Sequence, residues 1–337
     1  MNINIKVTVA VPVYGVEKYI ERCARSLFEQ TYRNIEYVFV NDCTKDNSMT
    51  VLHQVILDYP ERKGKILIID HPKNKGLAGA RNTAVENATG DFIMWVDSDD
   101  YIEKNAVELS VSKQKEGNYD IVRFNAIKYQ DGYVTFIHTK NYNSMKEYNL
   151  AAIRREAPVC VWGGIIRRDL YIKNNIRAEE GVNMGEDYQV MPRLIYFAKS
   201  YISIDRNLYH YDAFTNPNSV SHRFTREMNR QIWRAYDILA EFFEGKGEDY
   251  RDALNVSLLS IVSMNLVIST KTNDSDAYFD EAKKRLSLVK KELWISQPFG
   301  KRLMFYIVDY RILFIIYVKT TRFLSHLLLS IKYILKK

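Results

Sequence analysis

Four consecutive residues in the first third of the chain, Asp97-Ser98-Asp99-Asp100, place three carboxylates directly after an apolar run. Carboxylates this close together repel each other unless a cation or hydrogen-bond donors satisfy them. A divalent ion such as Mn²⁺ or Mg²⁺ prefers oxygen ligands and can also bridge a diphosphate. The alternative is structural, because Asp99 or Asp100 could cap the helix that we expect at 103–115.

A second acidic pair, Glu186-Asp187, follows Gly185 at the predicted start of a helix. The dipole and the free N–H groups of a helix N-terminus favour a carboxylate. An acid in that position suits a general base that removes a proton from a hydroxyl group. Taken alone, the pair is more typical of a helix cap or of a surface ion pair, for which Arg193 is one possible partner.

These acids need a scaffold, and the first 125 residues predict an α/β domain. Short β-branched runs alternate with amphipathic stretches of 10–15 residues, which is typical of a mostly parallel sheet flanked by helices. We expect strands at 7–14, 35–40, 65–70, 91–97 and 119–125, and helices at 17–30, 47–58, 77–89 and 103–115. Ligands bind such sheets at the carboxyl ends of the strands, where the acids lie. Residues 126–225 show a mixed pattern, and the chain is helical after about 225.

The strand ends lack the usual phosphate-binding loops. No GxGxxG follows the first strand and no GxxxxGK[ST] occurs in the sequence, which argues against dinucleotide and P-loop sites. The first strand ends instead in Pro12-Val13-Tyr14, and the second in Asn41-Asp42. The ring of Tyr14 offers a stacking face, and Asp42 offers an acceptor for an N–H group.

The charge is unevenly distributed. The 337 residues contain 48 Lys+Arg and 41 Asp+Glu, for a net charge of +7. Residues 299–337 contain eight basic residues and one acid, so they account for the whole excess, and the remainder is neutral. A neutral body excludes a basic nucleic-acid-binding surface, and we expect no nucleic-acid partner.

The three cysteines are widely spaced, which predicts neither a disulfide framework nor a zinc site. The N-terminus lacks the pattern of a signal peptide, so we expect a cytoplasmic protein.

Two long segments resemble the family 2 glycosyltransferases of the GT-A fold: VPVYGVEKYIERCARSLFEQTYRNIEYVFVNDCTKDNS and NKGLAGARNTAVENATGDFIMWVDSDD. The resemblance spans residues 1–125 in order and spacing. It implies an α/β, Rossmann-like, mostly parallel sheet with a C-terminal α-helical extension. It also implies an inverting enzyme, of the hexosyl- or N-acetylhexosaminyl-transferase type, that uses a nucleotide sugar.

The resemblance also assigns roles to individual residues on the donor side. Asp42 matches the acid that accepts the imide hydrogen of uracil, and Arg81 matches a basic residue near the nucleotide. Asp97 matches the acid near the ribose, and Asp99 matches the metal ligand that touches the diphosphate. The implied nucleotide-sugar-binding residues are Pro12, Val13, Tyr14, Asp42, Arg81, Asp97 and Ser98, and the implied metal ligands are Asp99 and Asp97, for Mn²⁺ or Mg²⁺. Gly15 and Asn41-Asp42-Cys43 depart from the residues common in the family.

Residues 159–200 resemble the acceptor side of the same family. The resemblance favours Asp187 as the catalytic base, with Glu186 as the second candidate. Trp162 is a candidate for the acceptor or sugar pocket, although core packing is equally compatible with its position. His210 is a further pocket candidate, and its alternative is a buried histidine whose nitrogens are satisfied by the protein.

The tail combines basic residues with apolar ones. The run 303–318 is too short for a comfortable membrane span and contains Asp309 and Arg311. Cationic residues beside an apolar helical face are typical of helices that lie in a membrane interface. We therefore expect a peripheral protein at the inner face of the cell membrane. The alternatives are a helical subdomain packed on the enzyme, or a homodimer interface.

Together these features predict a glycosyltransferase domain at 1–225, a helical region at 226–298 and a membrane-associating tail at 299–337. The expected function is metal-dependent, inverting transfer of a sugar from a UDP-sugar to a hydroxyl of a glycan or lipid-linked acceptor, in bacterial surface polysaccharide synthesis. One alternative is a non-catalytic, membrane-bound protein that binds sugar nucleotides. The other is a sugar-nucleotide pyrophosphorylase, which would need a Gly-rich basic loop after the first strand.

Overall fold

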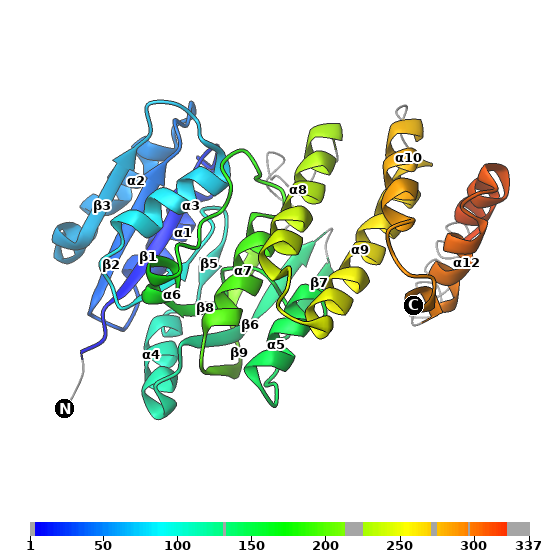
Figure 1. The fold of residues 1–337 in the computed structure, drawn as a ribbon. Coiled ribbons are helices and arrows are strands. Elements are labelled where there is room, and N and C mark those ends of the chain that lie inside the picture. Colours follow the sequence, from blue (N-terminus) through cyan, green and yellow to red (C-terminus); the bar gives the residue numbers. More distant parts are fainter. Residues whose placement is uncertain (1–3, 131–132, 213–224, 271–274, 296, 322–337) are drawn as a thin grey trace, which may run out of the picture. The chain divides into compact units, whose positions relative to one another are not determined.

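The computed structural model describes residues 4–130, 133–212, 225–270, 275–295 and 297–321. The chain forms two compact units, Met1–Phe242 and Phe243–Lys337. The first unit contains the sheet (Figure 1) and the candidate site acids Asp42, Asp97, Asp99, Glu186 and Asp187.

In the described residues, one sheet runs through the first unit, with the strand order β3-β2-β1-β4-β8-β6-β9-β5 and β7 paired to β6. Its strands are β1 (Val7–Val13), β2 (Ile35–Asn41), β3 (Ile66–Asp70), β4 (Phe92–Trp95), β5 (Tyr101–Ile102), β6 (Ile121–Gln130), β7 (Tyr133–Ile137), β8 (Gly164–Arg167) and β9 (Tyr201–Asp212).

The first four strands in sequence order form a parallel block, as the alternating pattern predicts. β1 pairs in parallel with both β2 and β4, and β2 pairs in parallel with β3. Every residue of β1 and of β4 is buried, which is typical of a parallel sheet covered on both faces. The carboxyl ends of these strands therefore share one edge, where Tyr14, Asp42 and Asp97 follow.

The second half of the sheet is mixed. The strand expected at 119–125 is the first part of β6, but it does not lie beside β4. β8 separates the two and is antiparallel to both. β9 then pairs in parallel with β6, and β5 joins the far edge antiparallel to β9. The α/β fold predicted from the sequence is confirmed, with antiparallel strands added to its parallel block.

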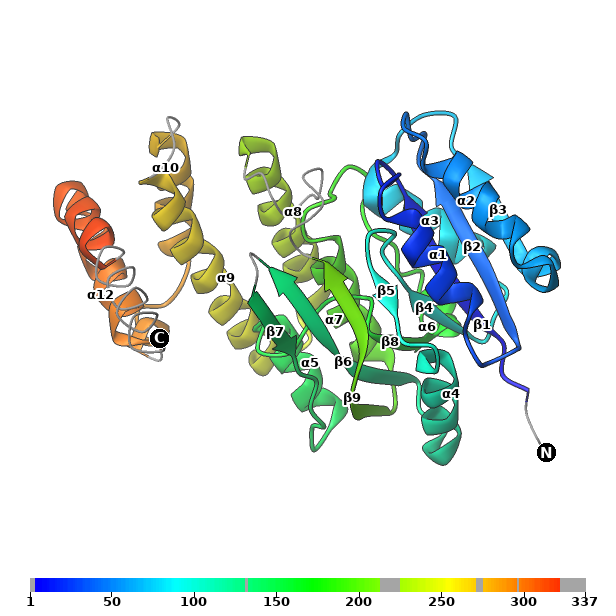
Figure 2. The same ribbon diagram turned by 180° about the vertical axis from the view of Figure 1, so that it is seen from behind.

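Helices cover both faces of the sheet, as the two opposite views in Figures 1 and 2 show: α1 and α2 lie on one face, and α3, α6 and α7 on the other. The helices of the first unit are α1 (Ile20–Phe28), α2 (Ser48–Leu57), α3 (Gly76–Asn87), α4 (Ala106–Gly117), α5 (Met145–Ile153), α6 (Arg168–Lys173), α7 (Glu186–Phe197) and α8 (Arg226–Phe243), with a 3₁₀ helix at Pro60–Lys65.

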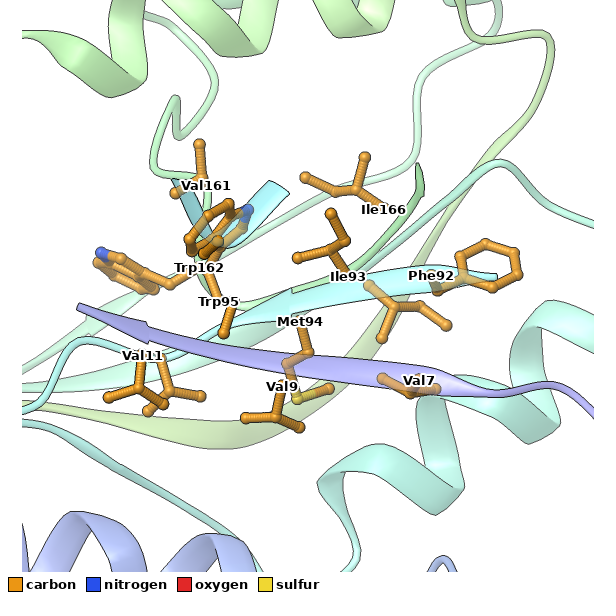
Figure 3. Close-up of a cluster of buried hydrophobic side chains, with 14 of the residues drawn as sticks. Val7, Val9, Val11, Phe92, Ile93, Met94, Trp95, Val161, Trp162 and Ile166 are labelled. Atoms are coloured by element: carbon orange, nitrogen blue, oxygen red, sulfur yellow. The ribbon is translucent and has the colours of Figure 1, made fainter. Parts of the chain in front are cut away.

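The core of the first unit lies between the sheet and these helices. Val7, Val9 and Val11 of β1 are fully buried, and Ile93 and Trp95 of β4 are at most 1% exposed. Figure 3 shows them together with Val161, Trp162 and Ile166, which come from the second half of the chain. One continuous core thus joins the donor half to the acceptor half predicted from the sequence.

The first unit extends past residue 225, where the sequence pattern becomes helical. Gln231 of α8 accepts hydrogen bonds from the backbone N–H groups of Asn183 and Met184, at 3.0 and 2.9 Å. Arg234 of α8 forms an ion pair with Glu179 at 2.7 Å. The first helix after 225 therefore belongs with the loop that precedes α7.

The second unit is helical in its described residues, with α9 (Glu248–Ser269), α10 (Ser275–Leu286), α11 (Glu292–Ile295), α12 (Phe299–Ile307) and a further helical segment at 311–321. By length and composition, α9 is the one described helix that could cross a membrane, and 61% of its apolar window is buried in the structure. That degree of burial fits the core helix of a helical unit. Residues 322–337, the basic end of the predicted tail, lie outside the described residues.

Candidate active site

The turn Asp97–Asp100 follows β4 at the carboxyl edge of the parallel block, and its three acids have different surroundings. Asp100 is fully buried, whereas Asp97 and Asp99 are half-buried. Tyr209 donates its hydroxyl hydrogen to Asp100 Oδ2 at 2.7 Å, and the backbone N–H of Asp212 donates to Oδ1 at 2.8 Å. Asp100 is therefore held by the protein, and Asp97 and Asp99 are the more exposed acids of the turn.

The alternative role of Asp99 or Asp100 as a helix cap is not observed. The following helix, α4, begins at Ala106 with Asn105 in the cap position. Burial raises the pKa of Asp100 well above its usual range, and the negative charges of Asp99 and Asp97 raise it further. The turn thus concentrates negative charge that a cation would relieve.

Arg81 of α3 brings the two acidic segments together. Its guanidinium forms an ion pair with Asp97 at 2.9 Å and with Glu186 at 3.1 Å, and it also pairs with Asp187. The guanidinium carbon lies 5.7 Å from the centre of the Trp95 ring. The acid predicted to bind the donor and the acids predicted to act as base therefore meet on one buried arginine.

Glu186 and Asp187 begin α7, as the sequence predicts, after Gly185 in a left-handed conformation. Burial raises the pKa of Glu186 to about 8, with a further contribution from Asp187, while Arg81 acts in the opposite direction. Burial also raises the pKa of Asp187, against the effect of Arg81. Both carboxyl groups are thereby moved toward the range in which an acid can exchange protons near neutral pH.

The alternative partner for these acids, Arg193, is engaged elsewhere. Its guanidinium donates to the backbone carbonyl oxygens of Gln189 and, at 2.7 Å, of Arg177.

A cavity of about 20 Å³, room for about one water molecule, lies between Arg81, Trp95, Tyr171 and the start of α7.

The nucleotide-side residues are divided between surface and core. Tyr14 is 53% exposed, so one face of its ring is open to a ligand. Pro12 and Val13 are buried in β1. The two residues lead into Tyr14 at the end of the strand, and their assignment as nucleotide-binding residues stays a prediction.

Asp42 is 3% exposed and already accepts several hydrogen bonds. Its Oδ1 accepts from His71 Nδ1 at 2.7 Å and from the backbone N–H of Lys75 at 2.7 Å. Its Oδ2 accepts from the backbone N–H of Gly76 at 2.8 Å. A carboxylate can accept about four hydrogen bonds, so Oδ2 retains capacity for one more donor. This arrangement fixes the direction in which Asp42 can accept an imide hydrogen.

Trp162 and His210 were both predicted as pocket residues, and in the structure both side chains are buried. Trp162 is 7% exposed, and its ring stacks on Tyr209 with centroids 4.5 Å apart. His210 is 8% exposed, and both ring nitrogens have protein partners, Glu103 at 2.8 Å and Tyr129 at 2.9 Å. Both nitrogens of His210 are thus satisfied by the protein, which fits the alternative of a buried histidine, and its assignment to the pocket stays a prediction. Trp162 packs in the core beside the site.

Sequence reasoning missed the residues that support the turn. Tyr209 and Asp212 hold Asp100, and Arg22 of α1 donates to the backbone carbonyl oxygen of Asp99 at 2.9 Å. The same guanidinium forms an ion pair with Asp212 at 3.0 Å. Nothing in the spacing of these residues marks them, because Asp100 and Tyr209 are 109 positions apart.

The residues around the turn fit a divalent cation that is shared with a phosphorylated ligand. No group of three or more His, Cys, Asp or Glu side chains suited to a metal occurs in the described parts of the chain. Mg²⁺ commonly binds through one or two carboxylates together with substrate phosphates and water. Asp97 and Asp99 provide such a pair of oxygen donors, whereas Asp100 is used internally.

Comparisons with known proteins agree with this geometry. Residues 8–174 match the model of the family described as Glycosyl transferase family 2. The glycosyltransferase GlyA of Streptococcus pneumoniae is 31% identical over 223 residues, which cover 63% of this chain and 31% of GlyA. The poly(ribitol-phosphate) beta-glucosyltransferase of Bacillus spizizenii is 35% identical over 120 residues, which cover 35% of this chain and 18% of the relative. This chain thus spans less than a third of the length of either relative.

The fold is also that of a solved structure, S. aureus TarS 1-349 in complex with UDP-GlcNAc. The TM-score is 0.74 at 20% identity, and the alignment covers 94% of this chain and 90% of that one. The α/β fold, the Glu186-Asp187 and Asp97–Asp100 segments joined at Arg81, and the family match lead to one assignment. The chain belongs to glycosyl transferase family 2 and is a glycosyltransferase with a GT-A fold.

Proposed function

We propose that this protein is a metal-dependent, inverting glycosyltransferase that moves a sugar from a UDP-sugar to an acceptor hydroxyl. The observation that carries the proposal is the pairing of Arg81 with both Asp97 and Asp187. It puts the acid expected near the donor and the acid expected to act as base within reach of one guanidinium. A binding protein without a reaction to catalyse has no need of that combination.

Two features support a uridine nucleotide as the donor. The exposed ring of Tyr14 can stack on a base, and Asp42 Oδ2 can accept one further hydrogen bond. An imide N–H is a donor that cytosine lacks at the same position. The complex of TarS with UDP-GlcNAc supports the same class of donor in a similar fold.

Asp97 and Asp99 would hold Mn²⁺ or Mg²⁺. When bound, such an ion supplies charge stabilisation for a departing diphosphate. The protein's own contribution is to keep Asp99 positioned through the hydrogen bond from Arg22 to its carbonyl oxygen, and to keep Asp100 fixed beneath the turn.

Asp187 would act as the base and Glu186 is the second candidate. Asp187 accepts the proton of the acceptor hydroxyl, and the hydroxyl oxygen forms a bond to the anomeric carbon as the bond to the diphosphate breaks. One displacement of this kind inverts the configuration. The dipole of α7 and the charge of Arg81 both favour the ionised form of Asp187 that this step requires.

The acceptor is proposed to be a hydroxyl of a glycan or lipid-linked molecule in bacterial surface polysaccharide synthesis. The support comes from the relative that acts on poly(ribitol-phosphate). The basic and apolar tail, residues 299–337, also supports an acceptor at a membrane surface.

The test is a panel of UDP-, GDP- and dTDP-sugars with Mn²⁺ or Mg²⁺, measured by thermal stabilisation and by donor hydrolysis. We expect one UDP-sugar to stabilise the wild type and to be hydrolysed slowly. Stabilisation by GDP-sugars alone would contradict the role of Asp42, and no response to any donor would refute the proposal.

The variant Asp99→Ala should fold and lose metal-dependent hydrolysis, because it removes a ligand without disturbing Asp100. Full activity of this variant would exclude Asp99 as a metal ligand. Asp187→Asn should retain donor binding and lose turnover by about 10²–10⁴-fold. An unchanged rate would place the base elsewhere, with Glu186 the next residue to test.

We further propose that the protein lies peripherally on the inner face of the cell membrane through its second unit. Ile312, Leu313 and Ile316 are 55–75% exposed in the helical segment 311–321, opposite the buried Phe314 and Val318. One apolar side of this helix is buried within its own unit, so the exposed apolar side needs a partner outside that unit. The net charge of +7 in 299–337 favours anionic lipid.

Sedimentation with vesicles of phosphatidylglycerol tests this placement. Ile316→Glu should reduce the bound fraction, whereas Leu57→Glu, at a residue that is 74% exposed in the first unit, should not. If Ile316→Glu instead converts a dimer into a monomer while vesicle binding is absent, the surface is a homodimer interface and the membrane proposal fails.

A further inference from the structure

A buried arginine near the site lacks the partner that its charge requires. Arg123 of β6 is 1% exposed. Its one hydrogen bond among the described residues goes from Nη2 to Cys160 Sγ, at 3.2 Å. Its Nε and Nη1 atoms are buried and have no hydrogen-bond partner there. A buried cation without a carboxylate costs several kcal/mol, so a residue of this kind reduces stability unless something offsets it.

The backbone around Arg123 makes room for its side chain. Gly163 has a φ of +82°, and a Cβ at that position would lie 3.6 Å from Arg123 Nη2. Gly164 faces β6 so closely that a Cβ there would collide with the carbonyl oxygen of Val122. Gly164, the first residue of β8, thus allows close approach to the backbone of Val122 and Arg123, whereas a Cβ at Gly163 would make only an ordinary contact with the guanidinium.

The partner of Arg123 begins a short segment, Cys160–Trp162, that touches both halves of the site. Val161 lines the same small cavity as Asp187, and its backbone is one of the groups that lower the pKa of that carboxylate against the effect of burial. The ring of Trp162 stacks on Tyr209, with 14° between the ring planes. Figure 3 shows Val161 and Trp162 beside the buried strands that lead to the carboxylate turn.

Tyr209 completes the connection to the donor side. Its hydroxyl accepts a hydrogen bond from the backbone N–H of Asp97 at 3.1 Å and donates one to Asp100 at 2.7 Å. The segment 160–162 therefore lies between the proposed base and the turn that carries the proposed metal ligands. A shift of this segment would move the two relative to each other.

We propose that Arg123 is a positioning residue that holds Cys160–Trp162 through the Cys160 thiol and thereby fixes Asp187 relative to the Asp97–Asp100 turn. Arg123 touches no substrate in this proposal. The inference rests on the proposed function, because it takes Asp187 as the base.

The positive charge also has a place in this site. Arg81 faces three carboxylates, so the cluster carries excess negative charge when all three are ionised. Arg123 Nη2 lies 3.2 Å from Cys160 Sγ, next to Val161 in the lining of the cavity that Asp187 shares. Burial raises the pKa of the Cys160 thiol, the charge of Arg123 lowers it and the charge of Asp187 raises it. Arg123 thus adds a second cation near the base, which a neutral side chain of similar volume would not.

The proposal predicts that stability and activity change in opposite directions. Replacing a buried, poorly paired charge by an apolar side chain is often neutral or stabilising. For Arg123→Met we therefore expect an unchanged or higher Tm, a donor KM within about twofold of wild type, and a kcat at least tenfold lower, which is about 1.4 kcal/mol in activation free energy. Arg123→Lys should recover part of the lost kcat.

Arg62 provides a matched control. It is also 1% exposed, but it donates to the carbonyl oxygens of Phe28 and Gln30, at 3.1 and 2.7 Å. It lies in the 3₁₀ helix that precedes β3, at the amino end of that strand, whereas the site lies at the carboxyl ends. Arg62→Met should lower Tm and leave kcat unchanged. A lower Tm for Arg123→Met together with a kcat as high as that of Arg62→Met would indicate a purely structural role and overturn the proposal.

A double-mutant cycle tests the route through the thiol. Cys160→Ala should lower kcat, and the double variant with Arg123→Met should be no slower than the slower single variant. Losses that multiply would show that the two residues act independently and would refute the link. If Arg123→Met does not fold, the positioning role is tested with Cys160→Ala and Arg123→Lys. A wild-type kcat in both of these variants overturns the proposal.

These outcomes are distinct from failure of the proposed function. Absence of donor binding by the wild type would refute that function. Normal donor binding together with a wild-type kcat in Arg123→Met would refute only the positioning role.

Discussion

Removal of one hydroxyl group, in Tyr209→Phe, should weaken both the fold and the site. The hydroxyl donates to Asp100 at 2.7 Å and accepts from the backbone N–H of Asp97 at 3.1 Å. The ring stays stacked on Trp162, so little packing is lost. Because the raised pKa of Asp100 favours its neutral form, its hydrogen bond contributes about 0.5–1.5 kcal/mol, and an unpaired buried N–H costs about 1–3 kcal/mol. We expect the free energy of unfolding to fall by about 2–4 kcal/mol.

For a unit of this size, such a loss lowers Tm by about 4–16 °C, since each kcal/mol corresponds to about 2–4 °C. Urea unfolding and thermal unfolding of the full chain, with and without a UDP-sugar and Mn²⁺, measure the effect. Tyr133→Phe is the control, because Tyr133 is 66% exposed in β7. A loss for Tyr209→Phe below about 0.5 kcal/mol, equal to the control, would show that the hydroxyl does not support the turn. Wild-type affinity for the donor in a destabilised variant would restrict Tyr209 to a structural role.

Two further predictions concern pH. Burial would raise the pKa of Glu36, but hydrogen bonds from Lys6, Thr8 and Thr89 outweigh it and lower the pKa to about 2. The resulting stability, about 1–2 kcal/mol after solvent screening, is present above pH 4.5 and is lost as the pH falls toward 2. Glu36→Gln should therefore be less stable than wild type at neutral pH, and this difference in the free energy of unfolding should shrink as the pH falls toward 2. The pKa of Glu186 is raised to about 8, so its folded state holds a proton that the unfolded state releases near pH 4.5. Wild-type stability should therefore fall as the pH rises from 4.5 to 8, and this slope should be smaller in Glu186→Gln; an equal slope would contradict the raised pKa.

The parallel block and the positions of its ligand-binding ends could be predicted from the sequence. Continuous apolar β-branched runs and helical spacing are local properties, so the strands at 7–14 and 35–40 appear within one or two residues of β1 and β2. The acids at the strand ends follow from the same pattern, because the carboxyl ends of parallel strands meet at one edge. Asp42 and Asp97 are therefore where the alternation of strands and helices places them.

The remainder depends on contacts between distant segments, which periodicity does not encode. The different roles of Asp99 and Asp100 follow from the position of β9, whose Tyr209 lies 109 residues away from Asp100 in the sequence. The same strand gives His210 its partners Tyr129 and Glu103, which no local pattern links to it. β8 likewise inserts antiparallel between β4 and β6, which point in the same direction, without a signal in either of them.

The charges around Arg81 suggest why donor and cation should bind together. One guanidinium faces Asp97, Glu186 and Asp187, and the raised pKa of Glu186 reduces but does not remove the negative excess. A nucleoside diphosphate brings further negative charge to the same edge of the sheet, where the half-buried Asp99 adds its own. Like charges in a partly desolvated site repel strongly, so an anionic donor gains little by entering alone. A divalent cation held by Asp97 and Asp99, as proposed, would offset this negative charge. The affinity for a UDP-sugar should then depend on the cation far more steeply than the affinity for uridine, which carries no phosphate.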